Sequence, residues 1–315
     1  MPLSERFLEL QGQVRNWGRW GDDDELGTLN LITPEVVLAA RDCIRTGRTF
    51  PLAVPLEHDG IQVGFIPGRD NPTRTMLMVD QGMDPDGDPD LFHTSDDAVQ
   101  LGLQAGTHWD GLCHVSYSGR VYNGFDASTI TAEDGATRCG IEKVGSLCSR
   151  GVLLDVARAK GIDLLDCPYA ITADDLDEAA SMGGVEVRAG DIVLVRTGRM
   201  RLYHESGGMA YCLGPSQDGS NAGLSLSTVP WFHERDVAAV ANDTLTFEVY
   251  PAEDVNLAVH MLHVVDMGLT QGQNWDLEAL ADDCAADGVY EFFLTATPEP
   301  FVGCVGSPVA PVAIK

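Results

Sequence analysis

The sequence predicts one compact α/β domain over residues 1–315, and three observations support this prediction. First, 315 residues are enough for one large hydrophobic core. Second, short apolar runs alternate with stretches of helical pattern through the middle of the chain. Third, neither an internal repeat nor a low-complexity linker divides the chain. We therefore expect a single unit built from interleaved helices and strands.

The first half of the chain contains a predicted helix, a strand and a loop. The helix begins at about Pro34, because Thr33 is placed to cap it and proline suits the first helical position. Gly47 is expected to end it. A short strand follows at 50–56. Residues 80–97 are acidic and interrupted by glycine and proline, so we predict a loop there.

The second half begins with alternating strands and helices. Apolar runs at 151–157 and 190–198 predict strands, and the second is continuous, as in strands that are buried on both faces. Between them, a helix is expected at 172–182, with Thr172 as its cap. A Gly/Ser-rich loop is predicted at 206–227.

The remaining elements are predicted from shorter patterns. We expect a helix at 234–243, a strand at 244–250, a helix from about Val255 and another helix at 275–288. Strands and turns close the chain at 290–314.

Composition narrows the classes of function. Forty-eight acidic and twenty basic residues give a net charge of −28. This argues against nucleic acids and anionic membranes as partners, since both require clustered Lys and Arg. The eight cysteines form no C-x-x-C pair and are expected to be reduced thiols. The N-terminal region has no apolar run, and no segment approaches 18 apolar residues, so a cytoplasmic protein is expected.

Several common catalytic motifs are absent from the sequence. It contains no G-x-S-x-G nucleophile elbow, no dinucleotide-binding or P-loop glycine motif and no H-E-x-x-H metal motif. Cys113 is the one cysteine beside a site-like cluster. We interpret it as a small buried residue, because a nucleophilic thiolate needs an electropositive pocket.

The segment QAGTHWDGLCH, which begins at Gln104, is the first candidate site. His108 and Asp110 are two residues apart, so both point to one side of an extended chain. A bend at 106–107 would bring Gln104 back toward them, and His114 follows close by. One imidazole and one carboxylate are a plausible half-shell for zinc or manganese. The spacing alone leaves open that these are structural histidines and a turn aspartate.

A second candidate cluster lies near the C-terminus. His260 and His263 are one helical turn apart, and Gln273 follows thirteen residues after His260. They are either core residues or the second wall of the site that contains His108.

Five sequence blocks, in order, resemble one known family. They are WGRWGDDDELGTLNLITPE, GTHWDGLCHVSYSGRVYNG, WFHERDVAAVAND, HMLHVVDMGL and GCVGSP. Over nearly its whole length the chain resembles the long-chain branch of the cyclase family of metal-dependent hydrolases, which includes bacterial kynurenine formamidase and isatin hydrolase. The resemblance implies an α/β domain with a mixed or barrel-like sheet and peripheral helices.

The resemblance also implies roles for individual residues. In the family motif H-x-G-T-H-x-D-x-x-x-H, the first two histidines and the aspartate hold a metal, and the last histidine transfers protons. By position, His108 and Asp110 would be metal ligands and His114 the acid/base. A later histidine of the family's site corresponds to His260.

The sequence departs from the family pattern at two positions. Gln104 replaces the first histidine of the motif, and Gln273 replaces a glutamate near the C-terminal end. A glutamine oxygen is a harder and weaker ligand than imidazole, which shifts the preference from zinc toward manganese or magnesium. The missing carboxylate at 273 predicts one bound ion, Mn²⁺ or Zn²⁺, and leaves the general base to His114 or His260.

The implied reaction is hydrolysis of a cyclic amide, an N-acyl arylamine or a lactone by a metal-activated water. Trp109, Phe65 and Phe92 are candidate substrate contacts, although strand alternation would instead turn Trp109 into the core. Relatives of this kind form homodimers or homotetramers, and residues 1–30, with Trp17 among them, are expected to help pairing.

Two other functions stay open at this point. The two glutamines would also suit a catalytically silent binding protein that has lost its metal. A cyclase or dehydratase that uses the same metal cannot be separated from a hydrolase by sequence.

Overall fold

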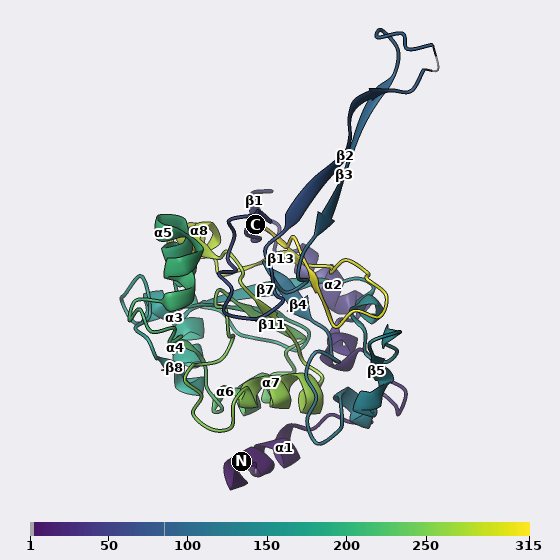
Figure 1. Ribbon diagram of the computed structural model, residues 1–315. Helices are drawn as coiled ribbons and strands as arrows, with labels where there is room; N and C mark the ends of the chain where they lie inside the picture. The colour runs from purple at the N-terminus through teal and green to yellow at the C-terminus, as the bar shows by residue number, and fades with distance from the viewer. Residues whose placement is uncertain (1–2, 85) are drawn as a thin grey trace.

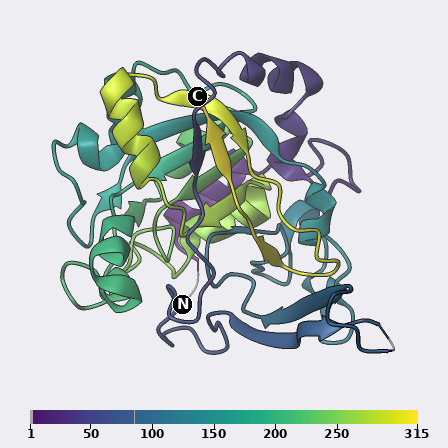
Figure 2. The same ribbon diagram turned by 90° about the horizontal axis from the view of Figure 1, so that it is seen from above.

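The computed structural model describes residues 3–84 and 86–315 and has a nine-stranded mixed sheet at its centre. The sheet curls, and helices lie around it (Figures 1 and 2), which confirms the predicted fold class. In spatial order the strands are β1 (Thr49–Pro51), β15 (Val312–Ile314), β13 (Glu291–Thr295), β7 (Cys148–Asp155), β9 (Ile192–Arg196), β11 (Ala239–Asn242), β12 (Thr270–Gln273), β4 (His108–Asp110) and β14 (Gly306–Pro308).

The four strands β7, β9, β11 and β12 are parallel neighbours at the centre of the sheet. Their residues alternate between two hydrophobic cores. Val193 and Val195 belong to one core, and Ile192 and Leu194 to the other. Both faces of β9 are therefore buried, which explains its continuous apolar sequence.

The helices lie at the periphery of the sheet. They are α1 (Glu5–Val14), α2 (Pro34–Arg41), α3 (Val156–Ala159), α4 (Ala173–Gly183), α5 (Met200–Leu213), α6 (Thr228–Glu234), α7 (Ala258–His260), which continues into the π-helix η5 (Met261–Met267), and α8 (Glu278–Asp287). At the start of α4, the hydroxyl of Thr172 accepts from the backbone N–H of Asp175, whose carboxylate accepts from the N–H of Thr172. This is the predicted capping arrangement.

Two segments of the second half differ from prediction. The segment 206–227 is a helix in its first part, because α5 continues through a kink at Gly207, where φ is 78°. The segment 234–243 contains strand β11 in place of a helix. Its Ala and Val residues are buried on both faces between β9 and β12, and such a run has no strand-like alternation.

Three further boundaries are corrected. Helix α2 ends at Arg41, before the expected stop at Gly47. The strand predicted at 50–56 is only the short β1. The segment 244–250 consists of turns with isolated bridges in place of a strand.

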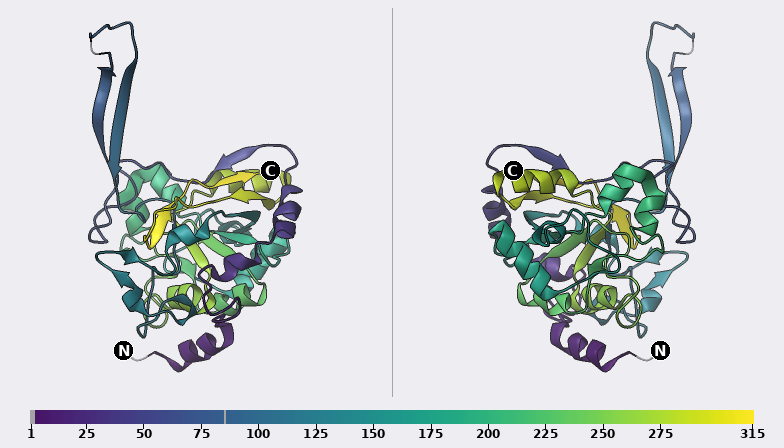
Figure 3. Two further views of the ribbon diagram at one scale, coloured as in Figure 1. Left: turned by 90° about the vertical axis from the view of Figure 1, so that its right-hand side faces the viewer. Right: turned by 90° about the vertical axis from the view of Figure 1, so that its left-hand side faces the viewer.

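The predicted loop at 80–97 belongs to a long antiparallel hairpin. Its strands, β2 (Thr73–Gly82) and β3 (His93–Gln100), pair with each other and project from the body of the molecule (Figures 1 and 3). Two short pairs lie elsewhere, β5 (Ile130–Thr131) with β6 (Gly135–Ala136) and β8 (Ala170–Ile171) with β10 (Gly223–Leu224). Within 3–84 and 86–315, the helices are too short or too polar to cross a lipid bilayer.

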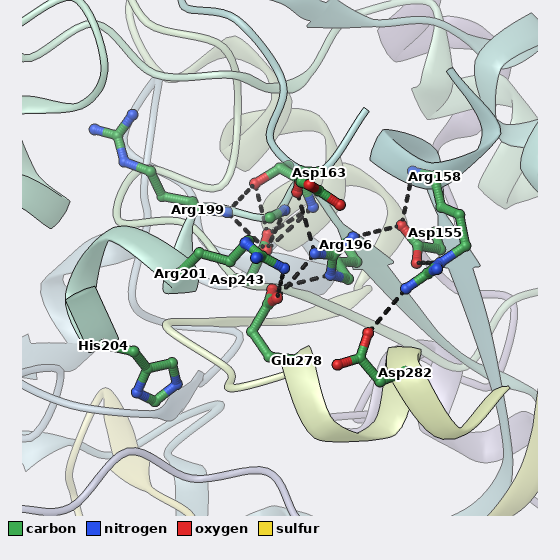
Figure 4. A network of polar contacts seen from close by, with 12 residues as sticks. Asp155, Arg158, Asp163, Arg196, Arg199, Arg201, His204, Asp243, Glu278 and Asp282 are labelled. Carbon is green, nitrogen blue, oxygen red and sulfur yellow. Dashed lines mark hydrogen bonds and ion pairs between the residues drawn. The ribbon is translucent and has the colours of Figure 1, made fainter. Parts of the chain in front are cut away.

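A buried polar network ties the ends of the central strands together (Figure 4). Arg196, the last residue of β9, donates to Asp155 at the end of β7 at 2.8 Å and to Glu278 of α8 at 2.8 and 2.9 Å. Asp243, just after β11, accepts from three consecutive backbone N–H groups of 197–199. The network therefore holds the C-terminal ends of β7, β9 and β11 in place relative to one another.

Candidate active site

Strand β4 carries the candidate site between two antiparallel neighbours, β12 and β14. His108 and Asp110 project from one face of β4, as their spacing predicts, and Trp109 projects from the other. Directly opposite residues of an antiparallel pair project to the same face. Gln273 of β12 pairs with His108, so its side chain joins that face.

Gln104 reaches the same face because of a glycine. Gly306 of β14 pairs with Asp110, and a Cβ atom there would lie 2.6 Å from the side-chain Nε2 of Gln104. The amide of Gln104 therefore occupies the space that a side chain at 306 would fill. The structure thus brings Gln104, His108, Asp110 and Gln273 together on one face of the sheet.

His108 and Asp110 direct two lone pairs toward each other. His108 Nδ1 lies 2.8 Å from the carbonyl oxygen of Gly106, so Nδ1 carries the proton and Nε2 does not. This bare Nε2 lies 3.4 Å from Asp110 Oδ1. Both atoms are buried, and neither has a hydrogen-bond partner within the described part of the chain. A cation between them would satisfy both atoms.

Asp110 is completely buried and ionised. Burial raises its pKa, but nearby His114, together with His108 and His260, outweighs this effect and holds the pKa well below its ordinary value. His114 Nε2 lies 3.7 Å from Asp110 Oδ1. Asp110 raises the pKa of His114, but burial, together with His108, His260 and Arg69, has the larger effect and lowers it, so His114 is a neutral acceptor at pH 7. Its side chain is 22% exposed against 1% for His108, so solvent reaches the site at His114.

His260 is held by a carboxylate that the sequence analysis does not identify. Glu248 accepts from the backbone N–H groups of Val259 and His260 at 3.1 and 3.0 Å, and His260 Nδ1 donates to it at 2.5 Å. Glu248 is only 4% exposed. The one signal in the sequence is the single acidic residue of the segment TLTFEVY, whose pattern predicts an ordinary strand.

The amide of Gln273 links the two walls of the site. Its Nε2 donates to Asp110 Oδ2 at 3.0 Å and contacts His260 Nε2 at 3.2 Å. Because Nδ1 of His260 donates to Glu248, its Nε2 is the acceptor for this second contact. Gln273 therefore supplies two N–H groups at the position where a carboxylate would supply negative charge.

The donor set fits one divalent ion. Over the described ranges, no three His, Cys, Asp or Glu side chains are arranged to hold a metal. His108 Nε2 and Asp110 Oδ1 are two buried acceptors that face each other and lack a hydrogen-bond partner there. Gln104 can complete the set, because rotation of its amide exchanges Nε2 for the carbonyl oxygen. That Nε2 is itself buried without a partner in the described structure, so nothing holds the amide in its present orientation.

The three aromatic residues expected to contact substrate are placed differently. Trp109 is completely buried, packs edge-on against Trp275 with ring centroids 4.9 Å apart and donates to the carbonyl of Ala296, which corrects the predicted substrate contact. Phe92 directly precedes β3 in the hairpin and is 68% exposed, and its contact with a substrate stays a prediction. Phe65 is 51% exposed in the loop before β2.

That loop also carries Arg69, a second residue that the sequence analysis does not identify. Burial lowers the pKa of Arg69 although nearby Asp110 raises it. Arg69 and Gln62 line a cavity of about 240 Å³, and the Gln62 side chain donates to the carbonyl of Ala105 at 2.9 Å. The loop is thereby attached to the segment that begins at Gln104.

His263 is a core residue and does not line the site. Its ring is completely buried, with edge-on contacts to Phe232 and Phe247 at 5.4 and 5.7 Å between centroids. Burial, with a smaller effect of His260, lowers the pKa of His263 to about 3. His263 is therefore neutral in the folded protein at pH values where an exposed histidine is charged.

This burial predicts an acid-sensitive stability. In the unfolded chain His263 takes up a proton below a pKa of about 6.5, whereas in the folded chain it does so only near 3. Its contribution is fully present above pH ~6.5 and is lost as the pH falls toward 3, by about 2 kcal/mol between pH 7 and 5. Urea unfolding at both pH values should show a smaller loss for His263→Leu than for the wild type. His58→Leu, at an exposed histidine, should behave as the wild type does.

Comparisons with known proteins identify a family and solved structures that this chain resembles. The Cyclase family model matches residues 44–249. A crystal structure described as a novel cyclase is 39% identical to this chain, with a TM-score of 0.85 over 96% of this chain and 100% of that one. Among curated proteins, none matches the sequence.

More distant structures share the fold. Isatin hydrolase A from Labrenzia aggregata is 18% identical, with a TM-score of 0.60 over 84% of this chain and 93% of its own. Isatin hydrolase A from Ralstonia solanacearum is 19% identical, with a TM-score of 0.58 over 89% and 97%.

Proposed function

Because this chain belongs to the Cyclase family, we propose that it is a metal-dependent hydrolase that uses water to open a carbonyl–nitrogen or carbonyl–oxygen bond. The substrates would be cyclic amides, N-acyl arylamines or lactones. The observation that carries the proposal is the buried pair of bare acceptors, His108 Nε2 and Asp110 Oδ1, with two further imidazoles beside them. The isatin hydrolases, which share the fold, support cyclic amides as the first substrates to test.

The ion would be held by His108, Asp110 and the side-chain oxygen of Gln104. When bound, a divalent ion polarises the carbonyl under attack and lowers the pKa of the attacking water. An imidazole, a carboxylate and an amide oxygen suit Mn²⁺ or Zn²⁺. Gln273 favours a single ion, because its N–H groups face Asp110 and His260 where a second cation would need acceptors.

His114 is the proposed base for the attacking water. It is neutral at pH 7, lies beside Asp110 and is the most exposed imidazole of the site. His260 is the proposed second proton carrier. Glu248 holds its Nδ1–H and would stabilise the imidazolium that forms when Nε2 gains a proton.

Arg69 provides the charge that the product requires. Each proposed reaction releases a carboxylate, and Arg69 is a half-buried guanidinium near Asp110 that makes no side-chain hydrogen bond or ion pair to the residues we can describe. A guanidinium can bind a carboxylate through two N–H groups. We therefore assign the acid end of the product to the Arg69 side of the site.

Elemental analysis of the purified protein, combined with hydrolysis assays, tests the proposal. We expect about one Mn or Zn per chain, activity on at least one of isatin, N-formylkynurenine or a lactone panel, and loss of activity on chelation that the metal restores. A protein without metal after growth in Mn and Zn, with ligand binding unchanged in His108→Ala, would instead support the silent binding protein. Formation of the ring in place of its opening would support the cyclase or dehydratase.

Replacing Glu248 with glutamine should slow turnover without weakening substrate binding. Glutamine has one acceptor oxygen for the three N–H groups that Glu248 now accepts, so His260 loses its fixed orientation. We expect kcat to fall roughly 10²-fold with KM nearly unchanged, and metal content to stay at the wild-type value. Glu253→Gln, at an exposed glutamate close by, is the matched control and should keep the wild-type kcat. If KM instead rises by as large a factor as kcat falls, Glu248 only supports the local fold.

A further inference from the structure

The bend at 106–107 separates Gln104 from His108, so its shape sets where both of these side chains lie. The carbonyl oxygen of Gly106 accepts two hydrogen bonds there, from His108 Nδ1 at 2.8 Å and from Asn274 Nδ2 at 3.0 Å. A carbonyl oxygen has two lone pairs, and both are used. The orientation of His108 therefore depends on a carbonyl group that Asn274 also holds.

The backbone of Asn274 holds the second residue of the bend. Its carbonyl accepts from the hydroxyl of Thr107 at 2.6 Å, and that hydroxyl accepts from the backbone N–H of Val54 at 3.0 Å. Asn274 is completely buried, and Thr107 is 2% exposed. Because a buried polar group that loses its partner pays the full cost of leaving water, these contacts hold the bend in one conformation.

The side-chain amide of Asn274 has one satisfactory orientation. Its Nδ2 must face Gly106, because a carbonyl oxygen accepts and cannot donate. Its Oδ1 then accepts from the hydroxyl of Tyr211 at 2.7 Å. Tyr211 belongs to α5 and is completely buried. A helix outside the sheet thus fixes the amide that supports His108.

The backbone conformation at position 274 explains why asparagine suits it. The φ angle is 60°, in the left-handed region, which asparagine adopts more readily than most residues other than glycine. Gln273, immediately before it, projects to the site and donates to Asp110. Because the chain turns at Asn274, the next amide reaches Gly106 instead. Two consecutive amides therefore hold two different parts of the site.

We propose that Asn274 is a positioning residue, which acts through Gly106 to keep His108 protonated at Nδ1 and bare at Nε2. The inference rests on the proposed function, because that function makes His108 a metal ligand. Without the amide of Asn274, the Gly106 carbonyl is free to turn, and His108 loses its fixed acceptor. The neutral ring can then carry its proton on Nε2, which lies 3.4 Å from Asp110 Oδ1 and would donate to it. A protonated Nε2 cannot bind a metal ion.

The protonation site of His108 is the first test, and it needs neither metal nor substrate. Asn274→Gly removes the amide, whereas the left-handed backbone and its carbonyl are compatible with glycine. Nitrogen-15 NMR of the metal-free protein should show His108 protonated at Nδ1 in the wild type and at a mixture of Nδ1 and Nε2 in Asn274→Gly. The signal is assigned by its absence in His108→Ala. A ring that stays protonated at Nδ1 alone in Asn274→Gly would overturn the proposal.

Metal affinity is the second test. Titration with Mn²⁺ should give a dissociation constant about 10- to 100-fold higher in Asn274→Gly than in the wild type, as for other groups that orient a ligating histidine. Tyr211→Phe leaves the amide in place but without its hydroxyl donor, and should change the affinity and the protonation site in the same direction by less. Asn16→Ala is the matched control. Asn16 is 5% exposed and its amide donates to the carbonyl of Met267 at 2.9 Å, so this variant should keep the wild-type values.

The outcomes separate this inference from the proposed function. A wild type that binds no metal contradicts the function, and the protonation site of His108 still decides the role of Asn274. An equal loss of affinity in Asn274→Gly and Asn16→Ala would show general destabilisation and overturn the positioning role. If Asn274→Gly does not fold, Tyr211→Phe carries both measurements, and wild-type values in that variant would also overturn it.

Discussion

Replacing Asp110 with asparagine is expected to abolish metal binding and to lower kcat/KM on the order of 10³-fold, because the ion that would polarise the carbonyl and activate the water is lost. Asparagine has nearly the same shape and can still accept the hydrogen bond from Gln273. It removes the negative charge that faces His108 Nε2, and Asp110 is the carboxylate that we assign to the proposed ion. Isothermal titration with Mn²⁺ or Zn²⁺ should show no binding, or binding at least about 10²-fold weaker.

A matched control separates the charge from the fold. Asp175 is 5% exposed, lies in the capping box of α4 and makes no contact with the site. Asp175→Asn should lower stability by about 1 kcal/mol and leave metal affinity at the wild-type value. Unchanged metal binding in Asp110→Asn would show that the ion, if there is one, is held elsewhere.

Replacing Asp243 with alanine is expected to destabilise the protein by about 3 kcal/mol or more. The carboxylate accepts from the N–H groups of Thr197, Gly198 and Arg199 at 2.8–3.1 Å, and all of these groups are buried. Alanine leaves three N–H groups without an acceptor, and each such loss costs about 1–3 kcal/mol. Urea unfolding followed by circular dichroism should show a lower midpoint and a similar slope.

Asp282 provides the control in the same network (Figure 4). It pairs with Arg158 at 3.0 Å, but its side chain is 72% exposed. Exposed ion pairs contribute little, so Asp282→Ala should change the free energy of unfolding by less than about 1 kcal/mol. If Asp243→Ala and Asp282→Ala lower the free energy of unfolding equally, the burial of Asp243 does not account for its contribution to stability.

Sequence patterns correctly predict the parts of this fold that depend only on residues close together in the sequence. The continuous apolar run of β9 and the helix cap at Thr172 are both found where they are predicted. The two-residue spacing of His108 and Asp110 correctly places their side chains on one face of a strand. These features require only the alternation of a strand and the geometry of a helix terminus.

The remaining features depend on contacts between distant segments. Strand β11 was predicted as a helix, since its Ala and Val residues are compatible with either structure until β9 and β12 enclose them. Glu248 becomes a functional candidate only once the fold brings it into contact with His260, which lies twelve residues later in the sequence. Arg69 approaches Asp110 through a loop whose path no local pattern specifies.

Two tryptophans that pack against the opposite face of β4 make the candidate site observable by intrinsic fluorescence. Trp109 and Trp275 are completely buried, and Trp275 Nε1 donates to the backbone carbonyl of His108 at 3.4 Å. Any ion or ligand that shifts His108 or Asp110 therefore perturbs the surroundings of these indoles. Intrinsic fluorescence should change on addition of Mn²⁺, and should not change in Asp110→Asn, so occupancy can be followed before any substrate is known.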